Sequence, residues 1–385
     1  MTTAPARPAR RARLAAATLA AAVALPLTAL SAAADPAHDP AHDGDVPLVV
    51  GHRGASAYVP EHTLAGYRLA ARTGADVIEP DLVPTKDGVL VVRHENEISG
   101  TTDVAEHPEF ADRRTTKTVD GVEQTGWFTE DFTLAELKTL RAVERLPELR
   151  QESTVYDGFY EVPTFEEVLA ERAALSEELG RDIGVIPEIK HSTYFQEIGL
   201  PMEQSVVALL AEYGLNAPDS GATVQSFELT NLVDLRTRYG LRADSVFLTS
   251  AEGAPYDLVA AGDPRTYADL LIPSALRDLA RHVNAVGPAL TQVVPLREDG
   301  TLGEPTTLVR DAHRAGLEVV PYTLRPENEF LPVDYRTGDD PADFGRVVDL
   351  AQEYFATGID GIFTDSPDVA VAARDRWLAE RDGEG

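Results

Sequence analysis

The chain has 385 residues, with 34 lysines and arginines, 64 aspartates and glutamates, and no cysteine. Its formal charge of −30 argues against binding to nucleic acid or to anionic lipid head groups, because both would be repelled. The lack of cysteine excludes a disulfide framework, but a chain of this length buries enough apolar surface to fold without one.

The first 34 residues are predicted to be a signal peptide rather than part of the fold. Four arginines precede an alanine-rich apolar run over residues 14–30, and residues 31–34 supply the small side chains of a cleavage site. A membrane anchor is the competing interpretation, but the run contains few strongly apolar residues and Asp35 follows it. Arg10 and Arg11 also suggest the twin-arginine route, although the general secretory route fits the alanine-rich run better. We therefore expect a secreted or extracytoplasmic protein with no stable membrane insertion after cleavage.

Removal of the leader makes the remaining chain more acidic. The leader holds four arginines and no acidic residue, so 30 basic side chains remain against 64 acidic ones, a formal charge of −34. An anionic substrate would then need a site whose local charge opposes that of the whole surface. Residues 35–46 repeat proline, alanine, histidine and aspartate and are expected to form a flexible lead-in, with metal binding by the histidines as the weaker alternative.

Residues 47–385 are predicted to form one α/β domain, a TIM-type (β/α)8 barrel with an insertion. Short apolar runs alternate with helical patterns, which indicates βα units around a parallel sheet. There are more strand candidates than the eight positions of such a barrel, so one is expected to lie outside it. The candidates are residues 48–51, 77–83, 89–92, 183–189, 223–227, 245–249, 285–287, 318–323 and 361–364.

The second and third candidates are too close together for a parallel crossover. Only residues 84–88 separate them, so a hairpin-like turn at Lys86 to Gly88 is expected. In that pairing residue 81 faces residue 93, and residue 79 faces residue 95. His94 is thereby predicted to lie beside Glu79 and Asp81.

Two polar segments are expected to border a pocket. Residues 96–162 contain few strand signals and many threonines, acids and aromatic residues, and are predicted to be an insertion after the third strand candidate. Residues 325–346 form a second polar excursion after the eighth candidate. Both follow strands, and active sites of this architecture lie at the C-terminal face of the barrel.

Acidic residues at two strand ends predict a metal site. Glu79 and Asp81 are two residues apart on an extended segment, so their side chains share a face and repel each other unless a cation lies between them. Glu188 is a third candidate ligand. Three carboxylates suit Ca²⁺ or Mg²⁺.

Two histidines and an arginine also follow apolar strands. A single histidine in such a place is more often a hydrogen-bonded core residue, but His52 and His94 converging on a carboxylate cluster are suited to act as general acid and base. Arg53 can hold phosphate oxygens bidentately, and Gly54 next to it allows the backbone to approach a ligand. This combination predicts metal-assisted attack on a phosphate ester.

A series of short motifs occurs in order between about residues 48 and 371. They are His52-Arg53-Gly54, Pro60-Glu61-His62-Thr63, Glu79-Pro80-Asp81, Thr85-Lys86-Asp87-Gly88, His94, Pro187-Glu188-Ile189-Lys190 and Phe363-Thr364-Asp365-Ser366-Pro367. In this order they resemble the glycerophosphodiester phosphodiesterase family, and most closely its exported bacterial branch. The sequence departs from many members in having Glu95 rather than aspartate after His94.

The resemblance implies a phosphodiesterase barrel and a role for each site residue. It makes Glu79, Asp81 and Glu188 the ligands of a divalent metal, usually calcium with magnesium as the alternative, and His52 and His94 the acid and base. Arg53 and Lys190 would contact the phosphate, and Gln225 would line the pocket. The implied reaction releases sn-glycerol 3-phosphate and an alcohol from a small glycerophosphodiester through a cyclic phosphate. The sequence indicates neither the leaving alcohol nor an oligomeric state.

Two kinds of alternative remain open from the sequence. On the same barrel, the substrate could be teichoic acid or a lysolipid, and an exposed apolar rim on residues 96–162 would favour a lipid. A protein of another class would bind its ligand through calcium without catalysis, but the presence of both His52 and His94 argues against it.

Overall fold

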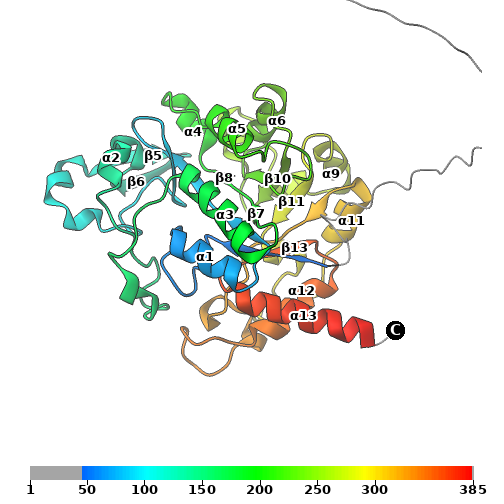
Figure 1. Ribbon diagram of the computed structural model, residues 1–385. Coiled ribbons are helices and arrows are strands. Elements are labelled where there is room, and N and C mark those ends of the chain that lie inside the picture. Colours follow the sequence, from blue (N-terminus) through cyan, green and yellow to red (C-terminus); the bar gives the residue numbers. More distant parts are fainter. Residues whose placement is uncertain (1–45, 384–385) are drawn as a thin grey trace, which may run out of the picture. The chain divides into compact units, whose positions relative to one another are not determined.

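The computed structural model describes residues 46–383, in which parallel strands and surrounding helices form a TIM-type (β/α)8 barrel (Figure 1). The strands are β1 (Leu48–His52), β2 (Val77–Glu79), β3 (Asp81–Pro84), β4 (Leu90–Val92), β5 (Thr115–Val119), β6 (Val122–Gly126), β7 (Gly184–Val185), β8 (Glu188–Ile189), β9 (Thr223–Ser226), β10 (Asp244–Thr249), β11 (Ala285–Pro288), β12 (Glu318–Val319) and β13 (Gly361–Thr364).

Most helices lie between successive strands of the barrel. They are α1 (Leu64–Arg72), α2 (Leu134–Leu137), α3 (Phe165–Leu179), α4 (Ser192–Glu197), α5 (Glu203–Glu212), α6 (Leu229–Thr237), α7 (Tyr256–Ala260), α8 (Tyr267–Leu270), α9 (Pro273–Leu279), α10 (Leu290–Val293), α11 (Leu308–Ala315), α12 (Val347–Ala356) and α13 (Pro367–Gly383). Short 3₁₀ turns are η1 (Val104–Glu106), η2 (Pro108–Arg113), η3 (Thr129–Asp131), η4 (Ser153–Tyr156), η5 (Asn328–Phe330) and η6 (Val333–Tyr335).

Prolines divide the barrel into two hydrogen-bonded ladders. One has the order β13-β1-β2-β7 and the other β12-β11-β10-β9-β8-β3-β4. Pro80 separates β2 from β3 and Pro187 precedes β8, and proline has no N–H to donate to a ladder. Past β12, the amide of Phe363 donates to the carbonyl of Pro321 and the amide of Leu324 donates to that of Phe363, which joins this segment to β13.

The extra strand candidate is β4, which pairs antiparallel with β3. Leu82 faces Val92, and the amide of Arg93 donates to the carbonyl of Asp81 at 3.0 Å. The predicted hairpin and its register are therefore confirmed. The pairing carries the chain back toward the C-terminal end of β2 just before His94.

The insertion contains a hairpin that the sequence analysis did not predict. Strands β5 and β6 pair antiparallel, and the turn between them consists of Asp120 and Gly121, both with positive φ. Few strand signals mark this segment, because the two strands are rich in exposed polar residues and lack an alternating apolar pattern. The Asp-Gly dipeptide was the available signal, since both residues tolerate the left-handed backbone of a type I′ turn.

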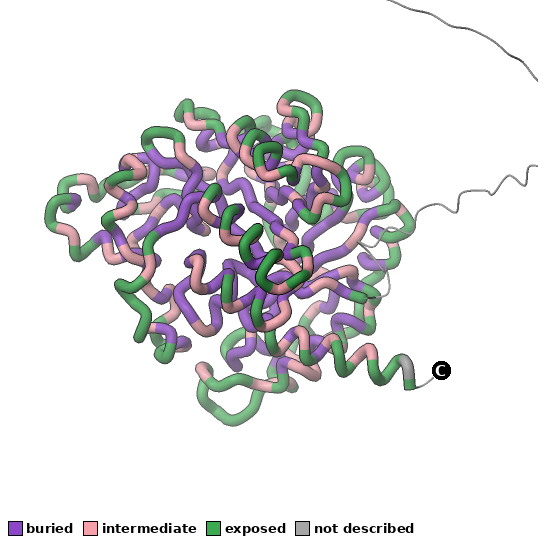
Figure 2. Tube along the Cα trace, viewed as in Figure 1, coloured by how far each residue is buried: buried purple, intermediate pink, exposed green. Residues whose placement is uncertain are grey.

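Local signals for the helices agree with the structure. Thr133 with Glu136 and Thr164 with Glu167 form complete capping boxes, and Gly180 and Gly316 end α3 and α11 in the left-handed conformation. The interior of the barrel is filled by Val50, Ile186, Val246, Leu248, Ala285, Val320 and Phe363. Figure 2 shows the barrel strands buried while most connecting loops are exposed.

The predicted signal peptide and nearly all of the predicted lead-in lie outside the described residues. Among residues 46–383, no helix combines the length and the apolar character needed to cross a lipid bilayer.

Candidate active site

Three carboxylates meet where β2, β3 and β8 adjoin. Glu79 and Asp81 flank Pro80, and Glu188 is the strand partner of Asp81. One oxygen from each of the three carboxylates lies within 4.8 Å of the others. The residues are only 1%, 1% and 6% exposed, so water contributes little to screening their mutual repulsion. The predicted ligand set is thus assembled in one buried place.

The electrostatics of this triad fit a divalent cation. Burial and the charges of Asp81 and Glu188 raise the pKa of Glu79 well above its usual range. Burial also raises the pKa of Glu188, to about 8, although Lys190 opposes the shift. Asp81 Oδ1 is buried with no hydrogen-bond partner. An unsatisfied carboxylate oxygen beside two carboxylates that resist ionisation is the environment that a hard cation stabilises.

Neighbouring groups hold the three carboxylates in place. His62 Nε2 lies 2.8 Å from Asp81 Oδ2, and the amide of Arg53 donates to Glu79 Oε2 at 2.8 Å. Gln225 donates from Nε2 to Glu79 Oε1 at 3.2 Å. The structure therefore places Gln225 against a triad carboxylate, and its predicted contact with substrate stays a prediction.

His52 ends β1 with its ring buttressed by an acid from the other end of the chain. Its Nδ1 lies 2.6 Å from Oδ1 of Asp365, which follows β13. The ring of Phe363 packs edge-on against the imidazole. Burial, reinforced by the charge of Arg53, lowers the pKa of His52 to about 4. When the neutral ring donates a hydrogen bond from Nδ1–H to Asp365, its Nε2 is free to accept a proton.

His94 has the same arrangement with a different acid. Its Nδ1 pairs with the carboxylate of Glu95, which stands where the sequence motif often has aspartate. Burial, followed by the charges of Arg53 and Lys190, lowers the pKa of His94 to about 3, while Asp81 opposes the shift. These interactions show that His94 lies within electrostatic range of the triad and of both predicted phosphate contacts.

Two cations complete the centre. Lys190 Nζ lies 2.7 Å from Glu188 Oε1, and Arg53 Nη1 donates to Glu61 Oε2 at 3.0 Å. With all three triad carboxylates ionised, their sum with these two cations is a local charge of about −1, which a divalent ion changes to about +1. Charge reversal by an ion is one way for an acidic protein to bind an anion.

Glu61 and Asp365 lie within two of the sequence motifs, but the sequence alone indicated no role for either residue. In the structure Glu61 contacts Arg53 and Asp365 contacts His52. The available signal for a role of Glu61 and Asp365 was their position in the segments that follow β1 and β13. Arg145 and Arg150 of the insertion also reach these acids, and no local pattern marked them.

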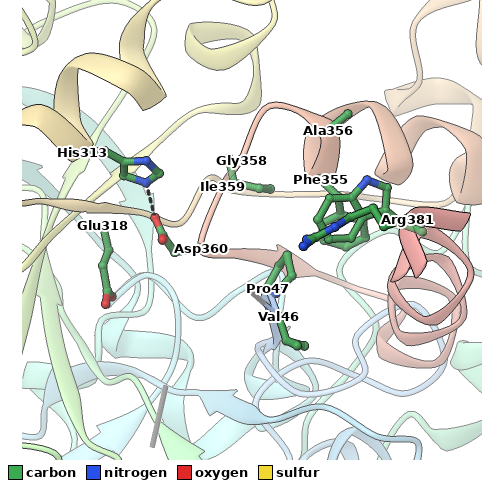
Figure 3. A pocket seen from close by; sticks show the side chains of 11 residues that line it. Val46, Pro47, His313, Glu318, Phe355, Ala356, Gly358, Ile359, Asp360 and Arg381 are labelled. Atoms are coloured by element: carbon green, nitrogen blue, oxygen red, sulfur yellow. Dashed lines mark hydrogen bonds and ion pairs between the residues drawn. The ribbon is translucent and has the colours of Figure 1, made fainter. Parts of the chain in front are cut away.

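A hollow of about 430 Å³ lies at the other end of the barrel. Its lining includes Pro47, Glu318 and Asp360, which precede or begin β1, β12 and β13 (Figure 3). In Figure 3 the ring of His313 points toward Asp360, and its Nε2 lies 2.8 Å from Asp360 Oδ2. The N-terminal face of such a barrel serves stability rather than chemistry, so the triad is the better candidate site.

The chain is similar to known proteins over most of its length. The profile of the glycerophosphoryl diester phosphodiesterase family matches residues 52–369. A glycerophosphodiester phosphodiesterase of Arabidopsis thaliana is 34% identical over 333 residues, which are 83% of each chain. One of Haemophilus influenzae is 27% identical over 347 residues, 84% of this chain and 88% of the relative.

Solved structures show the same fold. One is a phosphodiesterase of Oleispira antarctica in complex with the product sn-glycerol 3-phosphate, with a TM-score of 0.55 at 21% identity. The matched region is 86% of this chain and 97% of that structure. A glycerophosphodiester phosphodiesterase of Agrobacterium tumefaciens has a TM-score of 0.51 at 21% identity, with coverage of 85% and 99%.

We predict that Ca²⁺ raises the melting temperature more at pH 8.5 than at pH 6. The pKa of Glu188 in the metal-free fold, about 8, exceeds its unfolded value, so its stabilising contribution is lost as the pH rises through 8. The cation requires the ionised form, and its stabilising effect should grow over the same interval. Thermal unfolding with and without Ca²⁺ at the two pH values measures this difference.

The control is Glu177→Gln, which changes an exposed acid of α3 and should preserve the shift. Glu188→Gln should remove most of it. An equal shift at both pH values, or a full shift in Glu188→Gln, would contradict metal binding by the triad.

Proposed function

The chain belongs to the glycerophosphoryl diester phosphodiesterase family, and we propose that it hydrolyses small glycerophosphodiesters to sn-glycerol 3-phosphate and an alcohol. The observation that carries the proposal is the buried triad of Glu79, Asp81 and Glu188. Two imidazoles flank it, and each pairs through Nδ1 with a carboxylate. This set supplies the charge balance and the proton transfers that phosphodiester cleavage requires.

The two histidines would divide the proton transfers between them. One imidazole takes the proton of the glycerol 2-hydroxyl at its Nε2 as that oxygen attacks phosphorus. The other enters the step as an imidazolium, a form that its carboxylate partner and the anionic substrate favour, and gives its Nε2 proton to the departing alcohol oxygen, so that the glycerol moiety is left as a cyclic phosphate. In the second step the roles reverse: water is deprotonated, attacks phosphorus, and the 2-hydroxyl leaves with a proton. Asp365 and Glu95 stabilise each imidazolium when it forms.

We assign Glu79, Asp81 and Glu188 as ligands of a divalent metal, with calcium preferred over magnesium. A bound cation supplies positive charge against the carboxylates and against the charge that develops on the phosphoryl oxygens. Arg53 and Lys190 orient the phosphate, and Gln225 holds Glu79 through its amide nitrogen. Calcium is the better match because it tolerates an irregular set of oxygen ligands, whereas magnesium requires a nearly ideal octahedron.

An apolar rim supports a second candidate substrate, a lysophospholipid. On the insertion Val155 is 65% exposed and Phe159 72% exposed, with Tyr156 between them. Arg150 of the same segment reaches Asp365. An acyl chain could lie on these side chains while its glycerophosphate group occupies the triad. A teichoic-acid substrate and a purely calcium-binding function have no such feature in their favour.

Hydrolysis of glycerophosphocholine in the presence of Ca²⁺ tests the proposed function. We expect sn-glycerol 3-phosphate as a product, and we expect His52→Ala and His94→Ala each to lower kcat by roughly 100- to 10,000-fold, the usual worth of a general acid or base. The released sn-glycerol 3-phosphate is measured by a coupled enzyme assay, with lysophosphatidylcholine run in parallel.

The matched control is His282→Ala, which removes an exposed histidine and should leave kcat unchanged. A higher kcat/KM on lysophosphatidylcholine would favour the lipid alternative. No turnover of either substrate by the wild-type protein would refute the proposed function.

Removal of metal should weaken substrate binding and abolish turnover. In the inactive His94→Ala variant, we expect chelation of Ca²⁺ to weaken binding of the anion glycerophosphoglycerol by roughly tenfold or more, because two units of charge beside a phosphate are worth several kcal/mol at protein-like dielectric. Calorimetric titration with and without Ca²⁺ measures the change. Undiminished affinity in the metal-free protein would show that the carboxylates do not repel the substrate.

We further propose that residues 1–34 direct export and that residues 35–46 form a lead-in to the barrel. Arginines ahead of an alanine-rich run support this assignment. Expression in a bacterial host should yield an extracytoplasmic protein that begins at Asp35, as determined by N-terminal sequencing. An intact N-terminus on protein confined to the cytosol would count against export.

A further inference from the structure

Two arginines of the insertion hold the acids that support both imidazoles. Arg145 donates to Glu95 from Nη1 at 3.0 Å and from Nη2 at 2.6 Å. Arg150 donates from Nη2 to Asp365 Oδ2 at 2.6 Å. Glu95 pairs with His94 and Asp365 with His52, so one short stretch of a loop reaches the partners of both histidines.

Arg145 connects the His94 side of the site to Arg53. Besides Glu95, it donates to Glu61 from Nε at 2.7 Å and from Nη2 at 2.6 Å. Glu61 in turn accepts from Arg53 Nη1. The guanidinium of Arg145 thus lies between two carboxylates that would otherwise repel each other, and it fixes both.

Arg150 has the corresponding position on the His52 side. Its Nε donates to Glu327 at 2.6 Å and its Nη1 donates to the carbonyl of Ser56 at 2.8 Å. Its side chain is only 5% exposed. Asp365 is also buried, and although burial opposes its ionisation, Arg150 and then Arg325 hold its pKa well below the usual range. Without Arg150, a buried carboxylate would lose its strongest neutralising partner.

The loop that carries the arginines is ordered by its own contacts. Glu144 accepts from the amide of Leu146 at 2.8 Å and from the hydroxyl of Ser153 at 2.6 Å. Its own amide donates to Asp157 Oδ1 at 2.7 Å. The amide of Val143 bonds the carbonyl of Thr101 within the same insertion. Such a loop can deliver two side chains with little loss of precision.

We propose that Arg145 and Arg150 are positioning residues, through which the insertion fixes the orientation of His94 and His52. The inference rests on the proposed phosphodiesterase function. It makes the insertion a part of the catalytic machinery as well as a border of the pocket, because neither imidazole is held by barrel residues alone.

The alternative is that both arginines merely anchor the insertion. Arg113 offers a control, because it links parts of the insertion to one another but contacts neither the histidines nor their carboxylates. It pairs with Glu136 at 2.5 Å and stacks on Phe110 and Phe132. An anchoring role predicts the same kinetic effect for Arg145→Ala and Arg113→Ala, whereas a positioning role predicts a loss for Arg145→Ala alone.

The test compares the wild-type protein, Arg145→Ala and Arg113→Ala on the same glycerophosphodiester with Ca²⁺. We expect kcat of Arg145→Ala to fall by roughly 10- to 100-fold, as is usual when the support of a functional ligand is lost, with Ca²⁺ affinity unchanged. Added guanidinium ion should restore part of kcat, since the side chain of Arg145 is 27% exposed and its site can admit the ion. Arg113→Ala should retain the wild-type kcat.

Arg150 is too enclosed for rescue by an added ion, so it is tested with Arg150→Lys and Arg150→Met. The lysine variant keeps one charge near Asp365 and should retain more of kcat than the methionine variant. Equal kcat in the two, an unaltered kcat in Arg145→Ala, or a loss in Arg145→Ala that guanidinium does not restore would overturn the inference. An inactive wild-type protein would instead refute the proposed function.

Discussion

The site depends on one constraint, the mutual repulsion of three buried carboxylates that lie within a few ångströms of one another. Glu79, Asp81 and Glu188 are almost fully buried, and they cannot all carry charge there unless positive charge is brought among them. Lys190 and Arg53 supply part of it. The remaining deficit suits a divalent cation, and in the proposed function that ion would reverse the local charge that an anionic substrate meets. A protein with a formal charge of −30 can in this way attract a phosphodiester.

The barrel and its insertion contribute different things to this centre. The barrel strands supply the triad and His52, and the antiparallel β4 brings the chain back beside Asp81 just before His94. The long loops supply cations to the acids behind the imidazoles: Arg145 and Arg150 from the insertion and Arg325 from the excursion after β12. Each histidine is thus held through a carboxylate by a guanidinium, an arrangement that fixes the proton on Nδ1 and leaves Nε2 for chemistry.

Much of the fold and the centre of the site could be predicted from sequence because their signals are local. Apolar runs marked the strands, and the brief gap between residues 83 and 89 marked the antiparallel β4. The polar strands β5 and β6 gave no such pattern, and only the Asp-Gly turn indicated them. Arg145 and Arg150 could not be found this way. Their roles depend on where a long loop lies in three dimensions, and a loop arginine is ordinarily a solvated charge.

The position of the cation tests the central claim most directly. A crystal structure of the protein grown with Ca²⁺, with the ion located by its anomalous scattering, should show one ion at about 2.3–2.6 Å from oxygens of Glu79, Asp81 and Glu188 together. An ion bound elsewhere, or a triad that stays free of calcium at saturating concentration, would contradict the account.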